Sequence, residues 1–146
     1  MSEGGLYRRR MGVTMIGLDR GEESMRFPSW FAILVGCSMV AQWSVFLLSG
    51  NVPELRTEPV RIGFHLAAEL LTALVLIVSG TGALAAKRWA RPLLLVGLGM
   101  LVYTSIVSPG YFAQRGEMEF VLMFALVLAL TGAVIVSVLK SSLKFS

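Results

Sequence analysis

The residues best suited to chemistry are His65 and Glu69, which lie four positions apart in an otherwise apolar stretch. Residues i and i+4 share one face of a helix, so the imidazole and the carboxyl group are predicted neighbours. An ionisable side chain inside a membrane is costly and normally faces other helices, where it finds a partner. Two interpretations therefore stay open, a structural clamp between helices or a site that handles protons or binds a ligand.

Five further side chains are predicted to lie at a similar depth. Gln42 comes shortly before the end of the first apolar stretch, and Tyr103 lies near the end of the third. The segment 108–117, rich in turn-forming Pro and Gly, adds aromatic, amide and cationic groups and is expected to be a loop that dips below the membrane surface. The predicted site comprises His65, Glu69, Gln42, Tyr103, Tyr111, Gln114 and Arg115. After His65, Arg115 is the next candidate partner of Glu69.

No metal or cofactor site is predicted. His65 is the single histidine and Cys37 the single cysteine, which excludes multi-histidine and thiolate centres and any disulfide within the chain. The sequence also lacks a Walker loop, a dinucleotide fingerprint, a nucleophile elbow and a zinc-protease helix. An enzyme is therefore the less favoured class, although an intramembrane enzyme with Glu69 as acid–base stays an alternative.

Four apolar stretches must position these side chains. Hydrophobic residues make up 55% of the 146 positions and charged residues 15%, against about a quarter in soluble domains. The predicted spans cover about residues 30–49, 62–86, 92–108 and 119–139. Most are long enough for a helix to cross ~30 Å of hydrocarbon, and helices satisfy their own backbone hydrogen bonds there. We predict an all-α integral membrane protein with one transmembrane domain, a four-helix bundle over residues 30–139.

The distribution of Lys and Arg predicts the orientation. Ten of the 13 basic residues lie in segments 1–29, 87–91 and 140–146, and three lie in the loops 50–61 and 108–119. Because basic residues accumulate on the cytoplasmic side, both termini are predicted to be cytoplasmic (N-in/C-in), in the cell (plasma) membrane. The predicted site then falls in the outer half of the bundle.

Small residues and aromatic residues receive structural interpretations. Spacing by four predicts close helix packing at Ala32 and Gly36 in the first span. The same spacing occurs in the fourth span at Ala125, Ala129 and Ala133. Trp43, near the outer boundary, is assigned with other aromatic residues to an interfacial belt.

The first functional prediction is a non-catalytic subunit of a larger membrane complex, because the chain has no catalytic motif and a long cytoplasmic extension, residues 1–29. Residues 1–24 are either a functional extension or an overlong start, with Met25 as the true start. The alternative function is binding or transport of protons, a quinone-like molecule or a lipid at the predicted site. The expected partners are the lipid bilayer and other membrane subunits. Nucleic acid is excluded, because the basic residues form no stripe interleaved with aromatics.

Overall fold

The computed structural model describes the backbone of residues 3–50 and 52–143, and these residues are helical or lie in short connections. The helices are α1 (Glu3–Leu48), α2 (Glu54–Thr57), α3 (Pro59–Leu84), α4 (Ala90–Val107), α5 (Pro109–Gln114) and α6 (Met118–Leu143). No strand occurs in the described part of the chain. The prediction of an all-α protein is confirmed. The tail prediction for residues 140–146 lies partly outside the described residues, since 144–146 are not described.

Four segments are long and apolar enough to cross a membrane, as the sequence predicted. They are Met25–Leu48, Pro59–Leu84, Ala90–Gln114 and Met118–Ser141. The predicted extension 1–29 is helical from Glu3 onward, and α1 runs without a break from there through Pro28 into the first span. The cytoplasmic location of this extension stays a prediction. One local feature differs from the prediction.

The predicted loop 108–119 begins with a helix instead. Pro109 is the first residue of α5, a position at which proline needs no N–H and its fixed φ suits a helix. The chain therefore passes from α4 into α5 at Ser108 with helical backbone angles. The true turn lies further on, at Gly116, whose φ of 75° is a left-handed conformation that glycine adopts without a Cβ clash.

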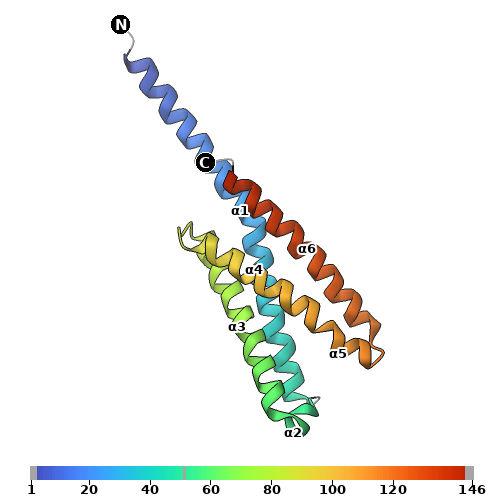
Figure 1. Ribbon diagram of the computed structural model, residues 1–146. Helices are drawn as coiled ribbons and strands as arrows, with labels where there is room; N and C mark the ends of the chain where they lie inside the picture. Colours follow the sequence, from blue (N-terminus) through green and yellow to red (C-terminus); the bar gives the residue numbers. More distant parts are fainter. Residues whose placement is uncertain (1–2, 51, 144–146) are drawn as a thin grey trace.

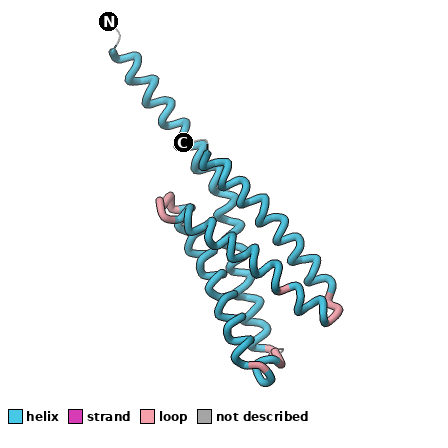
Figure 2. The backbone as a smooth tube through the Cα atoms, in the orientation of Figure 1, coloured by secondary structure: helices cyan, strands magenta, loops and turns pink. Residues whose placement is uncertain are grey.

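Neighbouring helices run antiparallel and form two hairpins, α1 with α3 and α4–α5 with α6 (Figure 1). The hairpins lie close together near the α3–α4 connection, which we call the closed end. They diverge toward α2 and the α5–α6 connection, which we call the open end (Figure 2). The C-terminal end of α6 and the part of α1 before its span lie toward the closed end, so both termini point the same way.

Two glycines allow the backbones of α1 and α3 to touch toward the closed end. A Cβ on Gly36 would lie 2.8 Å from the backbone oxygen of Ala73, and one on Gly80 would lie 2.7 Å from that of Ser29. Both distances are shorter than van der Waals contact, so only glycine fits. The predicted close packing at Ala32 and Gly36 is confirmed, since Ala32 is completely buried.

The α4–α6 hairpin completes the core with branched side chains. Its buried residues are Leu94, Leu98, Leu101, Val134 and Val138, packed with Ala32 and Leu76. Arg91 fastens the same region, because its guanidinium donates a 3.1 Å hydrogen bond to the carbonyl oxygen of Val138 and another to the Ser141 hydroxyl. Ala125, Ala129 and Ala133 are exposed, so the packing predicted for them does not occur within one chain. α6 turns its other face to the core.

Candidate functional site

A cavity of about 1040 Å³ lies at the open end, between the two hairpins. Both hairpins and the short helices α2 and α5 contribute to its lining. Glu69 of α3 reaches the cavity although its residue is only 7% exposed. The cavity arises because the small-residue contacts that hold α1 against α3 are not matched by similar contacts between the two hairpins at this end.

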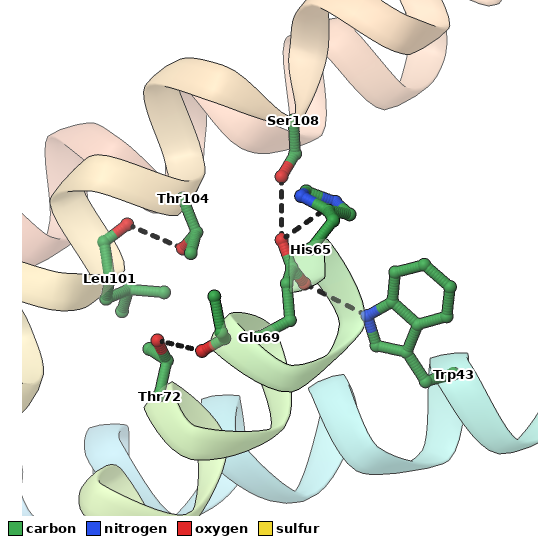
Figure 3. A network of polar contacts seen from close by, with 8 residues as sticks. Trp43, His65, Glu69, Thr72, Leu101, Thr104 and Ser108 are labelled. Carbon is green, nitrogen blue, oxygen red and sulfur yellow. Dashed lines mark hydrogen bonds and ion pairs between the residues drawn. The ribbon is translucent and has the colours of Figure 1, made fainter. Parts of the chain in front are cut away.

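The carboxylate of Glu69 joins three helical segments (Figure 3). Its Oε2 accepts a 3.1 Å hydrogen bond from Trp43 Nε1 on α1, and its Oε1 accepts a 2.7 Å hydrogen bond from the Ser108 hydroxyl between α4 and α5. His65 Nε2 lies 3.7 Å from the same Oε1, so the two residues form an ion pair when the imidazole is protonated. The pairing of His65 with Glu69 was predicted from their spacing on one helix face.

The polar group ends abruptly toward the centre of the bundle. Thr72 and Thr104 lie beside Glu69 on that side (Figure 3), but their hydroxyls donate to carbonyl oxygens of their own helices, at 2.8 and 3.1 Å. Because these hydroxyls bond to the backbone, the polar contacts of the Glu69 carboxylate are with Trp43, Ser108 and His65. Glu69 is therefore the innermost ionisable group that lines the cavity.

Aromatic rings form both walls of the cavity. On one side, Trp43 packs edge-on against His65, with ring centroids 6.0 Å apart, and against Phe46. On the other side, Phe112 of α5 stacks on Phe120 of α6 at 4.6 Å and lies 5.9 Å from Phe124. Two apolar, rigid faces thus flank a carboxylate floor.

The rim of the cavity carries charges that are paired locally. Arg61 forms an ion pair with Glu58, and Arg115 with Glu117 at 3.0 Å. Arg115 also donates a 2.6 Å hydrogen bond to the Tyr111 hydroxyl and lies over that ring. The hydrogen bond to Tyr111 and the charge of Glu117 raise the pKa of Arg115 above its ordinary value, so the guanidinium stays charged.

The structure brings six of the seven predicted site residues to this cavity. They are Gln42, His65, Glu69, Tyr111, Gln114 and Arg115. Tyr103 is not among them; it is 65% exposed and points away from Glu69, because α4 turns Thr104 and Ser108 toward α3 instead. Arg115 is not a partner of Glu69 either, since it pairs with Glu117 at the rim.

Sequence reasoning missed the two hydrogen-bond donors to Glu69. Trp43 was assigned to an interfacial belt and Ser108 to a loop. Trp43 is adjacent in sequence to Gln42, but the side of α1 that faces α3 depends on the Gly36 contact, which was predicted only as a packing feature. The available signal was Trp43 itself, a side chain with one hydrogen-bond donor next to Gln42 in the first apolar stretch.

The arrangement offers one titratable pair, His65 and Glu69, in contact with a cavity large enough for a small molecule. Ligand pockets typically enclose about 300–1,000 Å³ and have apolar walls with a few polar groups, as here. Within the described residues, no group of three or more His, Cys, Asp and Glu side chains is placed to hold a metal ion. The chemistry that the site supports is hydrogen bonding, charge pairing and proton exchange.

Comparison with known proteins gives one match. The sequence profile of a family described as a domain of unknown function (DUF8058) matches residues 22–145, which contain all four candidate spans and the cavity. No curated protein and no solved structure matches the chain.

Proposed function

Because the chain belongs to the DUF8058 family, described only as a domain of unknown function, we propose a function from its site: a membrane protein that binds a small amphipathic ligand in the open-end cavity. The observation that carries the proposal is the buried carboxylate of Glu69 at the floor of a cavity with aromatic walls. A clamp alone needs the hydrogen bonds to Trp43 and Ser108 but not the cavity beside them.

The proposal includes integral membrane insertion with the cavity facing outward. Four segments have the length and apolarity of membrane spans. The basic residues Lys87, Arg88, Arg91 and Lys140 gather at the closed end, and the positive-inside rule assigns that end to the cytoplasm. The ligand then reaches the cavity from the outer solution or from the outer leaflet.

Native mass spectrometry of the protein extracted from membranes tests the binding function. The wild-type chain is expected to carry a co-purifying small molecule. Gly110→Phe should reduce its amount at least tenfold, because Gly110 lines the cavity and a Cβ there meets nothing within 4 Å. Gly99→Phe is the matched control, since Gly99 is equally open but lies outside the cavity. Equal ligand content in Gly110→Phe and wild type would contradict the proposal.

Cysteine labelling tests the orientation. In a Cys37→Ala background, cysteines at Glu54 and Glu117 should react with an impermeant maleimide added to intact cells. Cysteines at Lys87 and Ser142 should react only after permeabilisation. Labelling of the position 142 cysteine in sealed cells would reverse the orientation and place the cavity on the cytoplasmic side.

A role as a non-catalytic subunit of a larger membrane complex is the second candidate. It is favoured by α1, which begins at Glu3 although its span begins at Met25, so about 33 Å of helix extends beyond the span. Such a helix presents a docking surface to a partner. Deleting residues 1–24 should preserve insertion but lower recovery of the complex from native membranes. Unchanged recovery would remove this candidate and leave the binding proposal intact.

A further inference from the structure

We infer that the ligand of the cavity is a monovalent organic cation with an apolar body, and that its positive charge replaces a proton on the His65–Glu69 pair. The inference rests on the proposed binding function and names the ligand class. It goes beyond a neutral quinone-like or lipid ligand, because it requires that binding and protonation exclude each other.

The first argument is the missing counter-charge at Glu69. The carboxylate accepts hydrogen bonds from two neutral donors, Trp43 and Ser108. Among the described residues, its one ion-pair partner is His65, at 3.7 Å. A buried carboxylate without a permanent positive partner is costly at membrane depth and demands a proton or a bound cation. The cavity beside it has room for the cation.

The other charged and titratable groups of the cavity do not neutralise Glu69. They are Glu54 of α2, Arg61 of α3, Tyr111 of α5, and Arg115 and Glu117 after it. Arg61 and Arg115 are each paired with a glutamate at the rim. The lining therefore carries an excess of negative charge, contributed by Glu54 and Glu69.

The second argument is the pair of aromatic walls. Cations are attracted to the faces of Trp, Tyr and Phe rings within about 6 Å, and most strongly to Trp. Trp43 lines the cavity from α1, and Phe112 and Phe120 line it from α5 and α6. An apolar body on the cation gains from the same walls, whereas a small hydrated ion does not.

The third argument is the charge difference between the two ends. The open-end connections carry Glu54, Glu58, Glu117 and Glu119 against three arginines, and Glu69 adds a further negative charge. At the closed end, the α3–α4 connection and the adjoining ends of α4 and α6 contribute Lys87, Arg88, Arg91 and Lys140, and α1 at the start of its span adds Arg26, Glu22 and Glu23. Five basic residues against two acidic residues leave this end net positive. The field between the two ends raises the local concentration of cations at the mouth of the cavity.

Competition with protons follows from the single binding charge. With one proton shared, the His65–Glu69 pair is neutral, and without it the pair is negative. The cation binds the negative form and displaces the proton to the solvent. Below the pH at which the pair takes up its proton, affinity for the cation should fall about tenfold per pH unit, as linkage requires.

The test uses the full chain purified in a maltoside detergent and the probe tetraphenylphosphonium. In a Trp30→Phe, Trp89→Phe background, Trp43 is the remaining tryptophan, so its fluorescence reports on the cavity. We expect saturable quenching that weakens as the pH is lowered, approaching about tenfold per pH unit, with up to one proton released per cation. Equal binding of neutral triphenylphosphine oxide, or pH-independent binding of the cation, would overturn the inference.

Two variants separate charge from fold. Glu69→Gln keeps the size of the side chain and should lose binding and proton release, with its thermal stability measured in parallel. Glu23→Gln, on α1 before its span and away from the open end, should keep both. The pH dependence of the wild type stands as a test even when Glu69→Gln is unstable. Undiminished binding by a folded Glu69→Gln protein would overturn the inference.

Competition with short-chain lipids identifies the source of the cation. Displacement of the probe by dioctanoyl phosphatidylcholine, but not by dioctanoyl phosphatidylglycerol, assigns the site to an ammonium head group. Displacement by neither assigns it to a free amphipathic cation. Equal displacement by both lipids would place the probe among acyl chains and overturn the inference. If the molecule that co-purifies with the wild type and is lost in Gly110→Phe is neutral, the proposed binding function stands, and only the inference of a cationic ligand is overturned.

Discussion

The closed end and the open end of the bundle are held together in different ways. At the closed end, α1 and α3 touch at Gly36 and Gly80, and branched side chains fill the space between the hairpins. At the open end, the hairpins diverge around a cavity, and the carboxylate of Glu69 bridges them through Trp43 and Ser108. At the closed end the helices are thus joined mainly by apolar packing, and at the open end they are joined by hydrogen bonds to one carboxylate.

This difference assigns packing stability mainly to the closed end and the proposed binding function to the open end of the same helices. Small-residue contacts are sensitive to changes in distance of a few tenths of an ångström, so the closed end tolerates few substitutions. The floor of the open end depends on hydrogen bonds that a ligand or a proton can alter without unpacking the core. Substitutions at the two ends should therefore change different properties of the protein.

The largest effect is expected from Gly80→Leu at the closed end. A Cβ there would lie 2.7 Å from the backbone oxygen of Ser29, so α1 and α3 must separate. We expect a loss of about 3 kcal/mol in unfolding free energy, at the upper end for overpacked sites. Thermal unfolding in detergent measures it. Gly99→Leu, at a position with nothing within 4 Å of a Cβ, is the control. Similar losses for both variants would contradict the conclusion that close α1–α3 packing at Gly80 stabilises the closed end.

At the open end, Glu69→Leu should cost about 2 kcal/mol, because Trp43 Nε1 and the Ser108 hydroxyl lose their acceptor. His65→Ala should cost less than about 1 kcal/mol, since its contact is 3.7 Å long and partly exposed. Chemical unfolding in mixed micelles compares the two variants. A larger loss for His65→Ala would show that the ion pair, rather than the neutral donors, holds the floor.

Among the described residues at the closed end, Arg91 makes side-chain hydrogen bonds from α4 to α6, and Arg91→Met removes them. Its hydrogen bonds to Val138 and Ser141 join α4 to the last turns of α6, so we expect a loss of about 1 kcal/mol. Arg88→Met, at an exposed neighbouring position, should stay within about 0.5 kcal/mol of wild type. Melting temperatures of both variants at two salt concentrations provide the measurement. Equal melting temperatures for the two variants would mean that apolar packing alone stabilises the closed end.

The smallest effect is expected at the α3–α4 connection. Ala86 adopts a φ of 51°, a left-handed conformation that costs an alanine about 1–2 kcal/mol. Ala86→Gly removes that strain but gives the unfolded chain more freedom, so a net gain of about 0.5 kcal/mol is expected. Differential scanning calorimetry should show a slightly higher melting temperature. A lower one would mean that the unfolded-state term dominates.

The sequence predicted the four apolar helices because length and apolarity alone define a candidate span. It also predicted the His65–Glu69 contact, because both residues belong to one helix and their spacing fixes their relative position. Contacts between helices were harder, as Tyr103 shows. Its depth was compatible with the site, but the rotation of α4 directs Thr104 toward α3 instead. Rotation depends on packing that no single helix contains.

The continuation of α4 into α5 escaped prediction for a related reason. Pro109 and Gly110 are typical of turns, and the same proline also suits the first position of a helix. Which outcome occurs depends on Phe112, which is buried against Phe120 and Phe124 of α6. That burial holds Ser108 beside Glu69. The packing of Phe112 therefore determines both the helical structure of α5 and the Ser108–Glu69 hydrogen bond.

The backbone contacts at Gly36 and Ser29 hold α1 against α3 at two points, so the two helices tilt together as one body. From Gly36 to Trp43, at the cavity, α1 measures about 10 Å, and from Gly36 back to Glu3 about 50 Å. A tilt of this pair about the level of Gly36 that displaces Trp43 by about 1 Å displaces Glu3 by about 5 Å in the opposite direction. Pro28, which lacks a backbone N–H, is the point at which such a rod bends most easily. The displacement that reaches Glu3 is therefore largest when α1 stays straight at Pro28.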